Sequence, residues 1–150
     1  MRTAYISGPI TGYENHNARR FNLTAGHARN KGYSVVNPIE LDKKIKPDDA
    51  WRWEDYLKRD LGEMCMHCNC IVLLPNWEKS RGAVLEVFVA WILQLDIILV
   101  DEAWIKTKSP EIPRPIGAMN IPFLTKLMSS MFKFFLIREA ITQEPICSNP

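Results

Sequence analysis

The chain has 150 residues, of which 47% are hydrophobic and 24% charged, and its formal net charge at pH 7 is +2. This length fits a single domain over 1–150 that buries roughly two-thirds of its unfolded surface. The near balance of charges argues against nucleic acid or an anionic membrane as a partner. The sequence shows neither a signal-type apolar segment nor about 18 consecutive uncharged apolar residues, so we expect a cytoplasmic protein.

The first 32 residues have the pattern of a strand, a loop and a helix. A β-prone run at 3–7 ends in the glycine-bracketed loop GPITG (8–12). Small and apolar residues then recur at helical spacing up to Gly32, which can end a helix. These residues are Ala18, Phe21, Ala25 and Ala28.

A second strand is predicted over 33–38, where Pro38 stops it. A polar connection leads from there to a helix that begins near Asp49. One face of this helix is expected to carry Trp53, Tyr56, Leu57, Leu61 and Met64.

The segment from 70 to 100 adds two more strands around a helix. The run CIVLLP (70–75) is apolar on both faces, which is typical of a buried strand. Ser80 is placed to cap a helix over about 81–94, and DIILV (96–100) follows as a fourth strand. Strands that alternate with helices imply right-handed crossovers and a parallel sheet of the α/β class, whose ligand site lies at the carboxyl ends of the strands.

After residue 100 the pattern weakens. The segment 106–117 is proline-rich, and a helix is predicted over about 121–137, although Lys126 and Lys133 interrupt it. We expect this helix to pack on the domain or on another subunit, with a helix lying on a membrane surface as the alternative. Its apolar stripe favours a homodimer or a larger even-numbered oligomer. The stripe consists of Leu124, Leu127, Met128, Met131 and Phe135.

Glu86 stands out because it is a carboxylate within the apolar run of the predicted helix over 81–94. An unpaired carboxylate on an apolar face is costly. Glu86 therefore either meets a partner from elsewhere in the fold, with Arg20 and Arg81 as candidates, or faces a cleft where it has a chemical role. Its neighbours at helical spacing, none of which can pair with it, are Gly82, Ala83, Val89 and Ala90.

Asp60 raises the same question on the preceding helix. The residues three and four positions away from it carry no positive charge, whereas Asp55 has basic residues at pairing distance and is interpreted as a solvated salt-bridging residue. Two acids without local partners, on helices that flank the same strand, are typical of a paired-carboxylate site. In such a site one ionised group attacks or stabilises, and the other, held protonated, donates a proton. The basic neighbours of Asp55 are Arg52, Lys58 and Arg59.

Two loops at the predicted edge of the sheet are candidates for binding an anion or sugar hydroxyls. The glycines of SGPITG (7–12) let backbone N–H groups approach a ligand closely. In SRG (80–82), the Ser80 hydroxyl and the amides of Arg81 and Gly82 are candidates to hold an anion. A tight turn and a simple helix cap explain the same residues.

The run CMHCNC (65–70) allows a metal or redox site built from Cys65, His67, Cys68 and Cys70. No second ligand pair at zinc spacing accompanies this run. We therefore interpret its cysteines as reduced, buried and structural.

Four segments, in this order and spacing, resemble the nucleoside 2-deoxyribosyltransferase superfamily: YISGPITG (5–12), NPIE (37–40), WRWEDYLKRD (51–60) and IVLLPNWEKSRGAVLE (71–86). The resemblance is strongest to a short, uncharacterised branch that phages and prophages often carry. It implies a flavodoxin-like parallel sheet with helices on both faces. It also implies a Glu nucleophile that cleaves the N-glycosidic bond of a 2′-deoxynucleoside or its 5′-monophosphate, without a metal or other cofactor.

The resemblance assigns roles by position. Glu86 is the nucleophile, Asp60 is the acid next to the leaving base, and Tyr5 orients the nucleophile. The separation of the two acids is similar to that in the branch that hydrolyses deoxynucleoside monophosphates. The residues expected to line the sugar or phosphate pocket are Gly8, Ser80 and Gly82, and the others expected at the substrate are Pro9, Ile10, Gly12, Asn37 and Trp77.

The expected partner is therefore a small-molecule nucleoside or nucleotide. Release of the sugar by water makes a hydrolase, and release by a second base makes a transferase. The alternative is a catalytically silent module that binds or sequesters a nucleotide on the same fold. Trp51, Trp53 and Trp91 are assigned to the core, whereas Trp77, in the loop before Ser80, is a candidate to cover a base.

Overall fold

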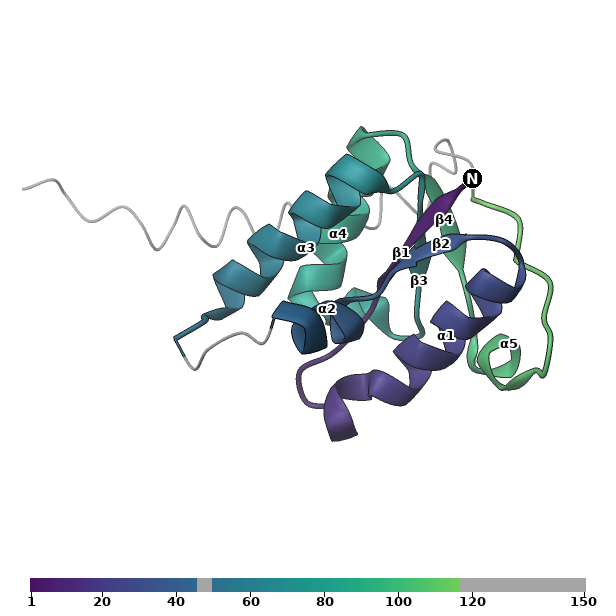
Figure 1. Ribbon diagram of the computed structural model, residues 1–150, viewed down its shortest axis with the longest axis horizontal. Coiled ribbons are helices and arrows are strands. Elements are labelled where there is room, and N and C mark those ends of the chain that lie inside the picture. Colours follow the sequence, from purple (N-terminus) through teal and green to yellow (C-terminus); the bar gives the residue numbers. More distant parts are fainter. Residues whose placement is uncertain (46–49, 117–150) are drawn as a thin grey trace, which may run out of the picture. The chain divides into compact units, whose positions relative to one another are not determined.

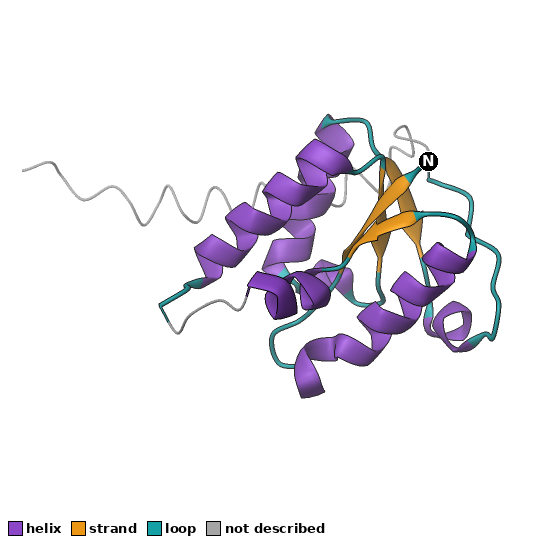
Figure 2. Ribbon diagram, viewed as in Figure 1, coloured by secondary structure: helices purple, strands orange, loops and turns teal. Residues whose placement is uncertain are grey.

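The computed structural model describes residues 1–45 and 50–116. Within these ranges it contains a parallel sheet with the strand order β2-β1-β3-β4, which confirms the α/β class. Figure 2 shows the sheet in orange, with helices on both of its faces. The predicted helix over 121–137 lies outside the described residues, and the single domain over 1–150 stays a prediction. The strands are β1 (Thr3–Ser7), β2 (Ser34–Val36), β3 (Cys70–Leu73) and β4 (Asp96–Leu99).

The helices form a layer on each side of the sheet. In Figure 1, α1 (Ala18–Asn30) and α5 (Glu102–Lys106) cover one face, and α3 (Trp53–His67) and α4 (Arg81–Ile92) cover the other. The short helix α2 (Pro38–Ile45) follows β2 directly. No helix in the described part of the chain has both the length and the apolar character that crossing a bilayer demands.

Alternation along β1 divides its side chains between the two layers. Ala4 and Ile6 belong to the hydrophobic cluster that includes Phe21 of α1. Tyr5 and Ser7 point the other way, toward α4, where both contact the same side chain. The central strand therefore supplies core residues to one layer and hydroxyl groups to the other.

Two short helices depart from the sequence-based prediction. α2 replaces the expected polar connection, because Pro38 fits the first turn of a helix as well as it ends a strand. α5 was not predicted, and Asp101 caps it by accepting a hydrogen bond from the Trp104 N–H at 2.7 Å.

The longer elements agree with the sequence-based prediction where the structure describes them. α3 begins at Trp53, and the expected start near Asp49 lies outside the described ranges. The four strands and the helices α1 and α4 lie where the sequence placed them.

A left-handed turn connects the loop after β1 to α1. Asn15, His16 and Asn17 have φ values of 47°, 54° and 59°. This region costs ordinary residues about 1–2 kcal/mol each, although asparagine and histidine visit it more often than most. The Asn17 side-chain amide donates to the Pro9 carbonyl oxygen at 2.9 Å, which ties the turn back to the loop.

Candidate active site

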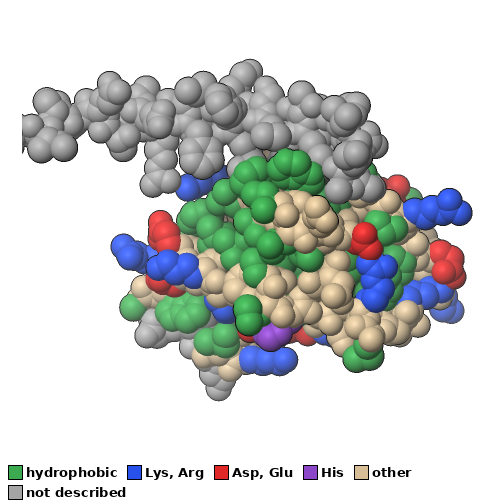
Figure 3. All heavy atoms as spheres, turned by 90° about the horizontal axis from the view of Figure 1, so that it is seen from above, with side chains coloured by type: hydrophobic (Ala, Val, Ile, Leu, Met, Phe, Trp, Pro, Cys, Tyr) green, Lys and Arg blue, Asp and Glu red, His purple; other side chains and the backbone are tan. Residues whose placement is uncertain are grey.

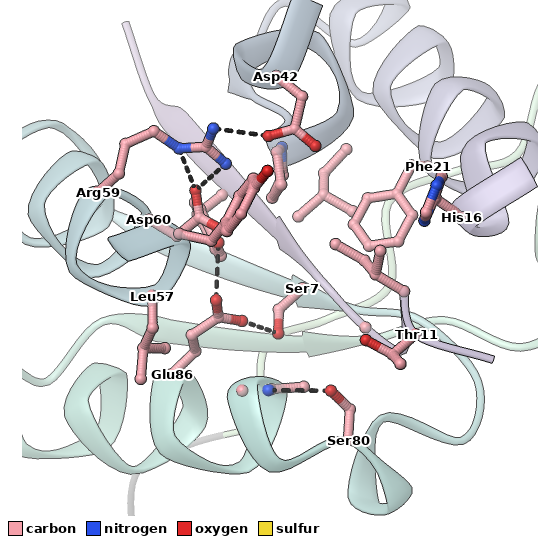
Figure 4. Close-up of a pocket in the computed structure, with 18 of the residues that line it drawn as sticks. Ser7, Thr11, His16, Phe21, Asp42, Leu57, Arg59, Asp60, Ser80 and Glu86 are labelled. Atoms are coloured by element: carbon pink, nitrogen blue, oxygen red, sulfur yellow. Dashed lines mark hydrogen bonds and ion pairs between the residues drawn. The ribbon is translucent and has the colours of Figure 1, made fainter. Parts of the chain in front are cut away.

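A cavity of about 410 Å³ opens at the carboxyl ends of the strands, between the loop after β1 and the start of α4 (Figure 4). The chain leaves β1 toward β2 and leaves β3 toward β4, so the connections run in opposite directions at this point. Open α/β sheets bind ligands at such switch points, and the volume lies in the range of small-molecule sites. The sequence placed the ligand site at this edge.

Two hydroxyl groups from β1 hold the Glu86 carboxylate. Tyr5 Oη donates to Oε1 at 2.8 Å, and Ser7 Oγ donates to Oε2 at 2.5 Å. Residues two apart on a strand share a face, which is why both hydroxyls reach the same residue of α4. Glu86 is only 6% exposed. Its partners thus come from β1, and the candidate Arg20 pairs instead with Glu102 at 2.7 Å.

Asp60 is held by the arginine next to it. Arg59 Nε donates to Asp60 Oδ1 at 2.8 Å, and Arg59 Nη2 lies 2.7 Å from the same oxygen. Arg59 Nη1 donates to Oδ1 of Asp42, on α2, at 2.6 Å. These contacts are drawn in Figure 4, and the side chains of Arg59 and Asp60 are 8% and 9% exposed.

The prediction that Asp60 has no local partner is therefore wrong, because Arg59 is adjacent to it in the sequence. Side chains of consecutive helical residues diverge, so a search at helical spacing does not consider Arg59. The long arginine side chain nevertheless turns back to the carboxylate beside it. Asp55, which was expected to pair with Arg59 among others, pairs with Lys58 at 3.7 Å.

Burial raises the pKa of both pocket acids. The pKa of Glu86 rises from 4.5 to about 7, although the hydrogen bonds from Ser7 and Tyr5 act to lower it. The pKa of Asp60 rises from 3.8 to about 6, with Arg59 opposing the rise. Burial and the Glu86 charge raise the pKa of Tyr5 well above 10.0. Burial thus moves the titration of both carboxyl groups from the acidic range toward neutral pH.

Residues 2–99 match the family described as "Domain of unknown function (DUF4406)". The chain belongs to this family. No curated protein matches it in sequence. Its structure is similar to that of 2-deoxyribosyltransferase from the psychrotolerant bacterium Bacillus psychrosaccharolyticus, with a TM-score of 0.52 and 16% identity, over 66% of this chain and 72% of that chain. The likeness shows that this DUF4406 protein shares the fold of that transferase.

The cavity of the DUF4406 chain gathers most of the residues that the sequence placed at the substrate. The exceptions are Pro9, Gly12, Asn37 and Trp77. Asn37 Oδ1 accepts from the Ile39 N–H at 3.1 Å and so stabilises the start of α2, while Trp77 is 9% exposed. The predicted residues that line the cavity are Tyr5, Gly8, Ile10, Asp60, Ser80, Gly82 and Glu86.

Two of the residues that line the cavity, Gly8 and Ser80, have structural roles. A Cβ atom at Gly8 would lie 2.8 Å from the Leu74 Cβ, so packing alone already requires glycine there. Ser80 Oγ accepts from the Ala83 N–H at 3.3 Å and caps α4. The binding and structural explanations of these residues are thus compatible.

Several cavity residues were not predicted from the sequence. The sequence could have identified Ser7, since it lies two residues after Tyr5 and so on the same face of β1. It gave no indication of Asp42, because the helix that carries Asp42 was interpreted as a connection. Trp53 was assigned to the core, and this is wrong: it is 38% exposed and lines the cavity, with the Arg81 guanidinium 4.5 Å from its ring centre.

The three cysteines in the described part of the chain, Cys65, Cys68 and Cys70, lie away from the cavity lining and are free thiols. Burial raises the pKa of Cys68 to about 12 and that of Cys70 to about 11, as expected for packed, unreactive thiols. Cys65, predicted to be buried, is exposed on α3. In residues 1–45 and 50–116, no group of three side chains is arranged to hold a metal ion.

Proposed function

We propose that this protein cleaves or transfers the N-glycosidic bond of a 2′-deoxynucleoside or its 5′-monophosphate. One observation carries the proposal: a buried carboxylate, Glu86, is fixed through both oxygens by Tyr5 and Ser7 in the same cavity as a second acid, Asp60. A fixed carboxylate beside a separate proton donor is the equipment that glycosidic cleavage requires. The fold shared with a 2-deoxyribosyltransferase supports the choice of substrate class.

In the proposed reaction, a Glu86 oxygen attacks the anomeric carbon C1′ and forms an ester with the sugar. The bond from C1′ to the base nitrogen breaks, and the base leaves with the electron pair while Asp60 gives it a proton. Water, or a second base, then attacks C1′ and releases Glu86, and its proton passes to Asp60. The hydroxyls of Tyr5 and Ser7 orient Glu86 before attack and stabilise its charge when it is released.

The pKa values imply a narrow pH range for this reaction. The productive form carries a proton on Asp60 and none on Glu86. Because the pKa values of Asp60 and Glu86 are about 6 and about 7, this form is most abundant near those values. We therefore expect activity to be greatest between about pH 6 and 7 and to fall on both sides.

A panel of 2′-deoxynucleosides and their 5′-monophosphates, with free base measured by chromatography, tests the proposal. Glu86→Gln keeps the size and one acceptor oxygen of the side chain, and we expect it to reduce base release by on the order of a thousandfold or more. A 2-fluoro-2-deoxynucleoside should leave a sugar adduct on Glu86 that mass spectrometry detects, because fluorine slows release of the ester.

Folding of the variant is checked by circular dichroism on the same sample. A folded Glu86→Gln variant with full activity would contradict the assignment of the nucleophile. Tight binding of a nucleotide without any turnover by the wild-type protein would instead favour the sequestering module.

A further inference from the structure

The Arg59 guanidinium is more constrained than an ordinary surface arginine. It contacts Asp60 of its own helix and Asp42 of α2, and its carbon lies 5.5 Å from the Tyr56 ring centre and 5.9 Å from that of Trp51. Burying such an ion pair has a large desolvation cost, so it is weak evidence for a role in stability. A buried arginine between two pocket acids calls for another explanation.

The contacts to Asp60 all fall on one oxygen. Arg59 Nε and Nη2 both approach Oδ1, so a proton held by this carboxyl group belongs on Oδ2. The guanidinium therefore distinguishes the two oxygens and fixes the rotation of the carboxyl group. Asp42 in turn fixes the guanidinium from the neighbouring helix.

We propose that Asp42 and Arg59 form a clamp that holds Oδ2 of Asp60 in position to protonate the leaving base. This inference rests on the proposed function for the identity of the proton acceptor. Arg59 and Asp42 are positioning residues, which act through Asp60. Because α2 supplies Asp42 and α3 supplies the other two residues, the clamp also fixes the distance between these helices at the cavity.

The charges around Asp60 determine how the clamp can be tested. Arg59 favours the ionised carboxylate, whereas Asp42 on α2 and Glu63 on α3 disfavour it. The other titratable side chains that line the cavity are Glu86 on α4, Tyr5 on β1, Tyr56 on α3 and His16 in the turn before α1. Removing Arg59 should therefore raise the pKa of Asp60, and removing the Asp42 charge should lower it.

A titration followed by carbon-13 NMR of the aspartate carboxyl groups measures this pKa without any substrate. Asp60→Asn assigns the Asp60 signal. We expect Arg59→Gln to raise the pKa of Asp60 and Asp42→Asn to lower it. Lys58→Gln is the matched control, because it removes a neighbouring cation of α3 that pairs with Asp55, and it should leave the pKa unchanged.

Kinetics then test the positioning role. For a substrate that the panel identifies, Arg59→Gln measured at its own optimal pH should lower kcat by about tenfold or more with KM little changed, because the proton donor is no longer held in place. If Arg59→Gln does not fold, the pKa of Asp60 in Asp42→Asn serves as the test, and we expect it to be lower than in the wild type. An Asp60 pKa that neither variant moves would overturn the clamp whether or not the protein is an enzyme. Moved pKa values without base release by the wild type would support the arrangement of the three side chains but contradict both the proposed function and the protonating role given to Asp60.

Discussion

Glu86 illustrates what a sequence reveals about a single residue. Its misfit in an apolar helix was visible from helical spacing alone, because none of the residues three or four positions away can pair with it. The partners it has, Tyr5 and Ser7, lie 81 and 79 positions earlier in the chain. Only the alternation of β1, combined with the parallel topology, brings them to the same helix. Local spacing can therefore identify a misplaced charge, but tertiary structure decides which groups hold it.

The raised pKa of Glu86 predicts a pH-dependent cost to stability. The folded pKa of about 7 lies above the ordinary value of 4.5. Below pH 4.5 the carboxyl group is protonated in both states, so nothing is lost, and the full cost develops as the pH rises through 7. This difference corresponds to roughly 3 kcal/mol.

Glu86→Gln removes this titration. We expect its melting temperature, relative to the wild type, to be higher at about pH 8 than at about pH 5. Glu54→Gln, at an exposed position of α3, is the control and should show no such change. Equal differences at the two pH values would mean that the carboxylate is not destabilised by burial.

At the scale of helices and strands, the sequence predicted long, periodic elements and missed short, polar ones. The strand of residues 70–73 was clear because it is apolar on both faces, and α4 because Ser80 caps it. Residues 38–45 contain four charged side chains among eight, and this polar composition led us to interpret them as a connection. Missing this helix also meant missing Asp42, so the clamp around Arg59 could not be inferred from the sequence.

The position of Trp53 on α3 suggests that this residue contributes to substrate binding. Trp53 and Leu57 lie seven and three positions before Asp60, on the same side of the helix, and all line the cavity. A base protonated by Asp60 would lie along this face. We expect Trp53→Ala to weaken nucleotide binding by roughly 5- to 150-fold, the range that stacking of a base on an aromatic ring supports.

2-Deoxyribose 5-phosphate, which has no base, should bind the wild type and Trp53→Ala equally, as measured by calorimetry. Met66→Ala is the control, since Met66 is a 77% exposed hydrophobic residue of the same helix that does not line the cavity. An equal loss of binding for the sugar phosphate would show that Trp53 acts on the fold of the site and not on the base.

At the scale of the whole molecule, exposed hydrophobic side chains predict self-association. Figure 3 shows hydrophobic side chains gathered on the face seen from above. Ile92 and Leu93, at the end of α4, are 56% and 46% exposed. Together with the apolar stripe predicted over 121–137, this exposure favours a homodimer or larger even-numbered oligomer.

Light scattering at micromolar concentration measures the assembly. The double variant Ile92→Lys, Leu93→Lys should shift it toward the monomer. Leu23→Lys, which changes a 39% exposed leucine of α1, should not. A wild-type monomer under these conditions would exclude the oligomer.

The left-handed turn at Asn15, His16 and Asn17 has a consequence for how the protein can evolve. Its backbone opposes the preferred hand of L-residues, so part of the folding free energy is used to hold His16 at the cavity lining. Glycine there would relax the backbone but remove the side chain from the site. Selection for heat resistance and selection for substrate choice would therefore act in opposite directions on the same short segment.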